Sequence, residues 1–174
     1  MYISGELTDA DARALCMRTV YWGPKWEEDG VNHELVLNCT GGAPYLTLAV
    51  ANALVEYPGP LTTYASGYCV GAGVLLLACG THRAAHPAAR FLVQGMLETE
   101  ELETIPNPDG EPLPPPRVSE AQWYNTWHDQ FLKRQTTEPA ATWGFLRESG
   151  LSWFGADDAL AWGLIHEVRN WRID

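Results

Sequence analysis

The sequence predicts an α/β fold with a mostly parallel sheet and helices packed outside it. A short apolar segment, a turn rich in glycine or proline, and a segment with apolar residues at helical spacing follow one another twice between Glu34 and Cys79. Strands that alternate with helices in this way pair in parallel. The 46% hydrophobic content is enough for one sizeable core, and the length of 174 residues is too short for two ordinary domains. We therefore expect residues 1–174 to form a single domain.

The first expected elements are a short strand and a helix. Tyr2–Gly5 is typical of a strand, and Thr8 followed by Asp11 predicts a capping box, in which each residue satisfies a backbone N–H group at the start of a helix. Ala12 and Leu15 then share one helical face, which we expect to be buried. The loop residues that follow this helix are Gly23, Pro24 and Gly30.

The next unit consists of a strand, a turn and a helix. Glu34–Leu37 is a short apolar strand that runs into a turn at Gly41 and Gly42. The apolar residues that follow at helical spacing are Leu46, Val50, Ala53 and Leu54. The Pro-Gly-Pro sequence at 58–60 ends this helix, because proline cannot continue its backbone hydrogen bonds.

The same unit then repeats. Leu61–Tyr64 predicts a strand, and Val70–Cys79 is uniformly apolar, as expected of a helix that is buried on all sides. His82 and His86 fall in the link between this helix and the next predicted strand, Arg90–Val93, where we expect ordinary surface histidines.

Residues 98–117 form an acidic, proline-rich insertion. Its prolines are Pro106, Pro108, Pro112, Pro114, Pro115 and Pro116. Such a segment cannot form a regular helix or a central strand. We expect an extended, partly polyproline loop, and a docking segment for a proline-binding module is the alternative.

Two further helices are expected towards the C-terminus. Ser119 can cap the first of them. Trp123, Trp127 and Phe131 recur at every fourth position of this helix, and an aromatic stripe of this kind is typical of a core or of a subunit interface. Residues 157–165 predict a short helix that is closed by a glycine and leads into a final strand.

The composition disfavours several classes of partner. With a net charge of −11 and only 11 Lys and Arg residues, the chain lacks the clustered positive charge that nucleic acids and anionic membranes require. No apolar run approaches the roughly 20 residues that cross a bilayer, and the N-terminus lacks the pattern of a signal peptide, so we expect a cytoplasmic protein. The cysteines, Cys16, Cys39, Cys69 and Cys79, are isolated. We therefore expect small buried thiols, with no metal site, no disulfide framework and no cofactor.

Four separated motifs together resemble one known family. They are N-C-T-G-G at 38–42, Y-A-S-G-Y-C-V-G-A-G at 64–73, P-A-A-R at 87–90 and D-D-A-L-A-W-G-L-I at 157–165. In this order they resemble the proteolytic subunit of the Clp protease, along nearly the whole chain. The resemblance implies a crotonase-like fold of repeated strand-strand-helix units and assembly into rings. It also puts the insertion at 98–117 in the handle region, which holds two such rings together in the family.

The resemblance implies that the family's catalytic triad is missing. The nucleophilic serine falls on Gly71, the histidine base on Gln94 and the aspartate, counted back from Trp153, on Arg147. Glycine has no side chain, and the amide oxygen of glutamine does not accept a proton at physiological pH. An arginine in place of the aspartate disfavours a protonated histidine. We therefore predict that these three positions cannot perform acyl transfer.

The family's oxyanion hole can survive this loss. It consists of backbone N–H groups, which the resemblance puts at Gly41, Gly42 and Ala72, and these groups need no particular side chain. Such a hole binds the carbonyl group of a peptide without cleaving it. Alternatively, Gly41 and Gly42 serve only a turn that needs positive φ. Cys69 and Ser66 are candidates for a replacement nucleophile, because they closely precede the empty serine position.

These features predict a pseudo-peptidase, a non-catalytic relative of the Clp proteolytic subunit with a structural, regulatory or peptide-binding role. The alternatives are an active ATP-dependent endopeptidase, of the serine type or based on Cys69, and a crotonase-type enzyme that acts on an acyl thioester. We expect a homo-oligomeric ring of about six or seven subunits, or a hetero-oligomer with an active paralogue. The chain starts at its first strand, without the family's N-terminal helix, which disfavours docking of a Clp ATPase.

Overall fold

The computed structural model of the chain describes residues 1–19, 32–96, 119–150 and 152–170. Its strands are β1 Tyr2–Leu7, β2 His33–Gly42, β3 Leu61–Val70, β4 His82–Ala85, β5 Arg90–Leu92, β6 Phe154–Gly155 and β7 Glu167–Val168. Its helices are α1 Asp9–Met17, α3 Pro44–Val55, α4 Ala72–Ala78, α5 Glu120–Gln135, α6 Ala140–Ser149 and α7 Ala156–Ala161. None of these helices is long and apolar enough to cross a membrane.

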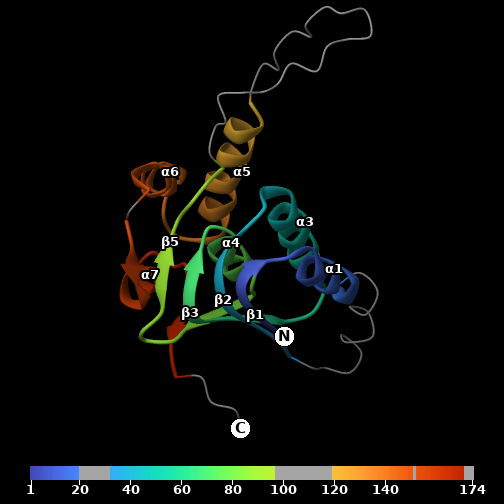
Figure 1. Cartoon of the computed structure of the whole chain (residues 1–174). Coiled ribbons are helices and arrows are strands. Elements are labelled where there is room, and N and C mark those ends of the chain that lie inside the picture. The colour runs from blue at the N-terminus through green and yellow to red at the C-terminus, as the bar shows by residue number, and fades with distance from the viewer. Residues whose placement is uncertain (20–31, 97–118, 151, 171–174) are drawn as a thin grey trace, which may run out of the picture.

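The described strands join one sheet, ordered β1-β2-β3-β4-β7, with β5 beside β3 and β6 beside β5. Every pair is parallel except β5 with β6. The long strand β3 divides the sheet, because Thr62–Ala65 pairs with β4 whereas Tyr68–Val70 pairs with β5. The predicted α/β fold with a mostly parallel sheet is thus confirmed (Figure 1).

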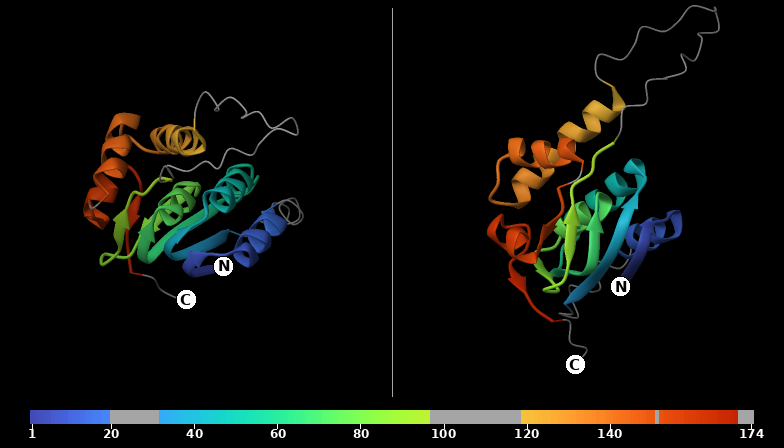
Figure 2. Two further views of the ribbon diagram at one scale, coloured as in Figure 1. Left: turned by 45° about the horizontal axis from the view of Figure 1, so that its top comes forward. Right: turned by 60° about the vertical axis from the view of Figure 1, so that its left-hand side comes forward.

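Helices cover the sheet and extend beyond the carboxyl ends of its strands. α1 packs on α3, α3 packs on α4, and α4 lies against β2 and β3. α5 contacts both α4 and α6 and rises past the strand ends, as Figures 1 and 2 show. The carboxyl ends of β2, β3 and β5 therefore point towards the same group of helices.

Two helix starts follow the predicted caps. The Thr8 hydroxyl accepts a hydrogen bond from the Asp11 N–H at 3.2 Å, and the Asp11 carboxylate accepts one from the Thr8 N–H at 3.1 Å. Ala12 and Leu15 are buried on this helix, as expected. The Ser119 hydroxyl likewise accepts from the N–H of Gln122 at 3.1 Å, which confirms the cap of α5.

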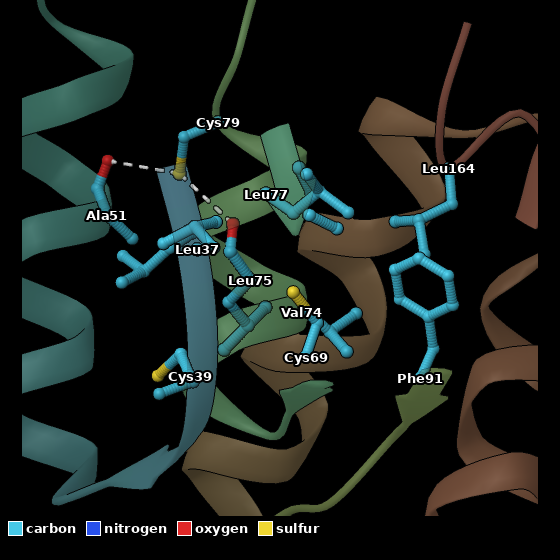
Figure 3. Packing of buried hydrophobic residues seen from close by; sticks show 14 of the residues in the cluster. Leu37, Cys39, Ala51, Cys69, Val74, Leu75, Leu77, Cys79, Phe91 and Leu164 are labelled. Atoms are coloured by element: carbon cyan, nitrogen blue, oxygen red, sulfur yellow. Dashed lines mark hydrogen bonds between the residues drawn. The ribbon is translucent and has the colours of Figure 1, made fainter. Parts of the chain in front are cut away.

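Helix α4 is buried at every position from Ala72 to Ala78, which confirms a helix surrounded by protein. It is shorter than predicted, because Val70 remains in β3. Cys79 ends it in the core shown in Figure 3, where its thiol lies 3.2 Å from the carbonyl oxygen of Leu75 and 3.8 Å from that of Ala51. The thiol therefore links α4 to α3.

Gly73 allows α4 to lie directly on β2. A Cβ atom built on Gly73 would lie 2.9 Å from the carbonyl oxygen of Cys39 and 3.0 Å from the Cys39 Cβ atom. Real side chains avoid such distances, and a strand backbone cannot yield as a flexible side chain does. The absence of a side chain at Gly73 therefore sets the distance between helix and sheet.

Arg83 joins β4 to the ends of two helices. Its side chain is 7% exposed, and its Nη2 group donates to the carbonyl oxygen of Gln135 at 2.7 Å and to that of Gly163 at 3.0 Å. Gln135 is the last residue of α5, and Gly163 follows α7. The guanidinium group thus satisfies carbonyl groups that helix ends leave without a partner.

Replacement of Arg83 by methionine is expected to lower the free energy of unfolding by about 2 kcal/mol, because two buried carbonyl groups lose a charged donor while the apolar volume is largely kept. Urea denaturation followed by circular dichroism measures the loss. Arg134→Met is the control, since Arg134 is exposed near the end of α5. Equal stabilities of the two variants would contradict the assigned role of Arg83.

The predicted position of His82 is wrong, and the strands predicted at Leu61–Tyr64 and Glu34–Leu37 are longer than expected. His82 belongs to strand β4, not to a link, and its imidazole pairs with Glu167 at 3.0 Å. β3 extends to Val70, because both β2 and β5 provide backbone partners beyond Tyr64. Gly41 and Gly42 are the last residues of β2 and pair with β1, although Gly41 has the positive φ of +140° expected there.

The aromatic stripe of α5 is only partly buried. Phe131 is buried and stacks on Trp127 at 5.4 Å between ring centroids, whereas Trp123 is 50% exposed. The other buried residues of α5 are Ala121, Tyr124, His128 and Leu132. The sequence patterns also give no sign of α6, because Trp143 is its sole buried residue.

Several predictions lie outside the described residues. They concern the loop with Gly23, Pro24 and Gly30 and the proline-rich insertion at 98–117.

Of the four cysteines, Cys39, Cys69 and Cys79 are buried as expected, and Cys16 is partly exposed.

Candidate functional site

The strand ends β2, β3 and β5 meet at a small cavity. Its volume is about 70 Å³, and it is lined by Gly41, Gly42, Pro44, Gly71, Ala72, Gln94, Gly95 and Tyr124. The carboxyl edge of a parallel sheet is where α/β proteins commonly bind ligands, because loops and helix starts gather there. The structure thus brings Gly71, Gln94 and the glycine pair from distant parts of the sequence to one place.

Gly71 and Gln94 face each other across this cavity. A Cβ atom built on Gly71 would lie 3.5 Å from the Gln94 Cβ atom and 3.9 Å from its Oε1 atom. Gly71 has φ +49° and ψ −103°, a backbone conformation that residues with a side chain rarely adopt. Any side chain at position 71 would therefore be strained and would point at residue 94.

Backbone hydrogen bonds fix the position of Gly71. Its N–H group donates to the carbonyl oxygen of Leu92 at 3.0 Å, which joins the end of β3 to the end of β5. Its own carbonyl oxygen accepts from Val74 at 3.1 Å and from Leu75 at 3.3 Å, in the first turn of α4. Both backbone polar groups of Gly71 are therefore hydrogen-bonded, which fixes the position of this residue relative to Gln94.

Gly41, Gly42 and Ala72 form another part of the cavity wall. A Cβ atom built on Gly42 would lie 2.7 Å from the Leu7 Cβ atom and 3.4 Å from the Ala72 Cβ atom. The end of β2 therefore approaches Leu7 at the end of β1 closely because residue 42 has no side chain, and Ala72 at the start of α4 lies at ordinary contact distance. This wall offers mainly backbone to a ligand, and backbone N–H groups bind a carbonyl oxygen without help from side chains.

Arg147 lies beside the Gln94 segment, with its charge directed elsewhere. A Cβ atom built on Gly95 would lie 2.5 Å from the Arg147 Cδ atom, so the stem of the arginine packs on this backbone. Its guanidinium group donates to Asp129 from Nε at 3.2 Å and from Nη2 at 3.1 Å, and Glu148 lies 3.4 Å away. Arg147 is thus near Gln94 in space and is bonded to Asp129.

Asp129 is a charged group that sequence reasoning missed. Burial alone would raise the pKa of its carboxyl group, but hydrogen bonds from His128 and Arg147 outweigh this and lower the pKa below its usual value. His128 Nδ1 lies 3.0 Å from Asp129 Oδ1, and the histidine is fully buried. Asp129 therefore stays ionised and holds α5 and α6 together.

Cys69 and Ser66 do not line the cavity. Cys69 is fully buried, and this burial strongly raises the pKa of its thiol, with the neighbouring Cys39 adding to the effect. The Ser66 hydroxyl donates to the carbonyl oxygen of Leu37 at 3.1 Å. The structure thus gives neither residue the activated, accessible side chain that a nucleophile needs.

Tyr124 is a further cavity residue that sequence reasoning missed. It is 6% exposed, and burial raises the pKa of its hydroxyl group to about 12, against a hydrogen bond with Thr47 that lowers it. The hydroxyl group therefore stays protonated at physiological pH. The spacing of Ala121, Tyr124 and His128 could have revealed this buried face, but the conspicuous tryptophans mark another face of the helix.

Metal ligands are not gathered at this cavity. Across the part of the chain that the structure describes, no group of three or more His, Cys, Asp or Glu side chains is placed to hold a metal ion. Among the residues that line the cavity, Gln94 carries a side-chain amide and the glycines offer only backbone groups, and both kinds of group suit hydrogen bonding to a neutral ligand.

Comparison with known proteins gives a consistent result. The profile of the Clp protease family matches residues 1–103. The structure is similar to the crystal structure of the ClpP protease catalytic domain from Plasmodium falciparum, with a TM-score of 0.77 over 99% of this chain and 85% of that one. The two sequences are 17% identical over this match, so the likeness concerns the fold. No curated protein sequence matches the chain.

Proposed function

The chain belongs to the Clp protease family, and we propose that it is a member that binds peptides without cleaving them. Its role would be that of a structural, regulatory or peptide-binding subunit. One observation carries this proposal: the residue pair that faces across the cavity consists of Gly71 and Gln94, whose Cβ positions are 3.5 Å apart.

A hydrolase of the serine type needs a nucleophile and a base at such a facing pair. Gly71 offers no oxygen or sulfur atom, and the Gln94 amide does not take up a proton near neutral pH. Each loss alone disables acyl transfer, and the two are independent. A protein that keeps this geometry without these groups binds a carbonyl group but does not attack it.

The third triad position supports the same proposal. Arg147 lies next to Gly95 and is bonded to Asp129, so the Asp129 carboxylate is engaged by Arg147 and does not orient a base at position 94. We therefore assign Gly71, Gln94 and Arg147 to the family's serine, histidine and aspartate positions. The positive charge of Arg147 is opposite to that of the aspartate in the family.

The backbone wall gives the proposed binding role its physical basis. Gly41, Gly42 and Ala72 line the cavity, and the two glycines can offer only backbone groups to a ligand. Enzymes stripped of a Ser-His-Asp triad keep roughly 10³ to 10⁴-fold acceleration over water, which is far below useful proteolysis. We therefore propose that these groups bind peptide carbonyl groups with negligible turnover.

Assembly and location are part of the proposal. Large exposed apolar side chains, which are typical of protein interfaces, occur at Tyr2, Met17, Tyr45, Val55, Tyr68, Trp123, Phe145, Trp153 and Leu160. Membership of the Clp protease family supports assembly, and we propose a homo-oligomeric ring of about six or seven subunits, or a hetero-oligomer with an active paralogue. We propose that this assembly acts in the cytoplasm.

A hydrolysis and labelling experiment tests the loss of catalysis. The purified protein is expected to leave fluorescein-labelled casein intact and to take up no serine-reactive fluorophosphonate probe. The double variant Gly71→Ser, Gln94→His is expected to take up the probe at position 71, because the two side chains would then face each other. Gly71→Ser alone is the matched control and is expected to stay unlabelled.

Cleavage of casein by the unmodified chain would refute the proposal. In that case Cys69→Ser and Ser66→Ala would identify the nucleophile, because one of them would abolish the cleavage. Labelling of the unmodified chain at a single residue would refute it equally.

A further inference from the structure

The chain after β5 loses its strand neighbour beside the cavity. The hydrogen bond from the Gly71 N–H to the Leu92 carbonyl oxygen, 3.0 Å long, is where β3 leaves β5 and turns into α4. Residues 93–96 then run on towards α5 (Figures 1 and 2) and belong to no strand of the described part of the chain. Backbone groups on the edge that faced β3 therefore need other partners.

A single side chain supplies such partners at Met96. The Asn125 Oδ1 atom accepts a hydrogen bond from the Met96 N–H at 2.8 Å, and the Asn125 Nδ2 group donates to the Met96 carbonyl oxygen at 2.9 Å. Neighbouring antiparallel strands exchange the same two bonds between one pair of residues. The amide of Asn125 thus takes the place of a strand at this residue, because it carries one acceptor and two donors.

The segment is also held at the residue before Met96. A side chain on Gly95 would overlap the Asn125 Oδ1 atom, and its Cβ atom would lie 2.5 Å from the Arg147 Cδ atom. Arg147 is itself fixed by its two hydrogen bonds to Asp129. Asn125 of α5 and Arg147 of α6 therefore both pack against the backbone of Gly95.

The site is narrow in this arrangement. The Gln94 carbonyl oxygen would lie 3.7 Å from a Cβ atom on Gly71, and the cavity that both residues line measures about 70 Å³. Ligand pockets typically measure about 300–1,000 Å³. The cavity is therefore much smaller than a typical ligand pocket while Gln94 and Gly95, which line it, stay in place.

We propose that the Asn125 side chain takes the place of a bound peptide backbone. By bonding Met96, it blocks the edge of segment 92–96 with which a peptide would otherwise pair. In an extended segment, alternate residues present their backbone groups to the same edge, so Leu92, Gln94 and Met96 share the edge that β3 has left. An extended peptide would pair with this edge after displacing the Asn125 amide. This inference rests on the proposed peptide-binding function, and the ligand class is an unfolded or extended polypeptide.

The test compares the full-length protein with Asn125→Ala, and with Gln122→Ala as a control on the exposed side of the same helix. Hydrogen-exchange mass spectrometry follows the backbone up to Met96, and fluorescence anisotropy measures binding of fluorescein-labelled casein, an unfolded protein. Asn125→Ala is expected to speed exchange at Met96 and to bind casein about tenfold more tightly, because no closed state competes with the ligand. Gln122→Ala is expected to change neither quantity.

A second variant separates the two hydrogen bonds. Asn125→Asp keeps the size of the side chain and the acceptor for the Met96 N–H, but it sets a carboxylate oxygen against the Met96 carbonyl oxygen. It is expected to raise casein affinity in the same direction as Asn125→Ala. Because it has the same shape as the native residue, it keeps the inference testable even if Asn125→Ala fails to fold.

Two results would overturn the inference alone: unchanged exchange at Met96 in Asn125→Ala, and faster exchange at Met96 without tighter casein binding. No casein binding by any variant would overturn both the inference and the proposed peptide binding. Casein fragments on a gel would overturn only the proposed loss of cleavage, so the failures are distinguishable.

Discussion

Gly73→Ala is expected to destabilise the protein by about 3 kcal/mol, which is the upper end of the usual cost of overpacking a core. The added methyl group would lie 2.9 Å from the Cys39 carbonyl oxygen, 3.0 Å from the Cys39 Cβ atom and 3.5 Å from the Cys69 Cβ atom. All three atoms belong to or adjoin the backbone of β2 and β3. α4 would have to move off the sheet, and every residue of α4 is buried.

The direction of this effect distinguishes packing from helix propensity. In an exposed helix, replacement of glycine by alanine stabilises by roughly 1 kcal/mol. Urea denaturation of Gly73→Ala should show the opposite sign. Gly155→Ala is the control, because residue 155 has φ −100° and its added Cβ atom would meet only the flexible Arg90 Nη1 atom at 3.0 Å. A stabilised Gly73→Ala variant would disprove the close contact of α4 with β2.

Trp143→Ala is expected to lower the free energy of unfolding by about 3–5 kcal/mol, as large-to-small changes of buried tryptophan do. Trp143 is fully buried, and its ring lies edge-on to that of Trp162 at 6.1 Å between centroids. Its indole N–H donates to the Thr136 hydroxyl at 3.0 Å. Because Trp143 is the one buried residue of α6 in the described range, its loss should detach this helix.

Thermal unfolding followed by circular dichroism checks this expectation. Trp153→Ala removes a tryptophan of the same size that is 49% exposed and contacts Tyr68 edge-on at 5.7 Å. This control is expected to cost about half as much as Trp143→Ala, because about half of the Trp153 side chain is already exposed to solvent. Similar losses in both variants would contradict the role of Trp143 as the anchor of α6.

The sequence patterns predicted the elements whose signal lies within a short stretch of sequence. Ala72–Ala78 is uniformly apolar and is a buried helix, and the Thr8 and Asp11 side chains cap α1 as expected. β4 escaped prediction because its first residues are His82 and Arg83. Burial of Arg83 depends on carbonyl groups 52 and 80 residues away, which no local pattern encodes.

The candidate site was likewise only partly predictable from the sequence. Family resemblance suggested Gly71 and Gln94, but their facing geometry results from the pairing of β3 with β5, which periodicity does not specify. Asn125 was missed because a polar residue on a helix gives no sign that it bonds a backbone 29 residues earlier. Tertiary contacts of this kind become visible only once the helices are placed.

The buried guanidinium group of Arg83 has a consequence for the order in which the chain folds during synthesis. The ribosome releases β4 before it releases the carbonyl groups of Gln135 and Gly163, which lie beyond the matched range 1–103. His166 also donates its N–H to the Arg83 carbonyl oxygen at 2.8 Å, so this strand has several late partners. We therefore expect a nascent chain that ends before Gly163 to leave β4 without its neighbour β7 and Arg83 without one of its carbonyl partners, so that this side of the sheet is completed last.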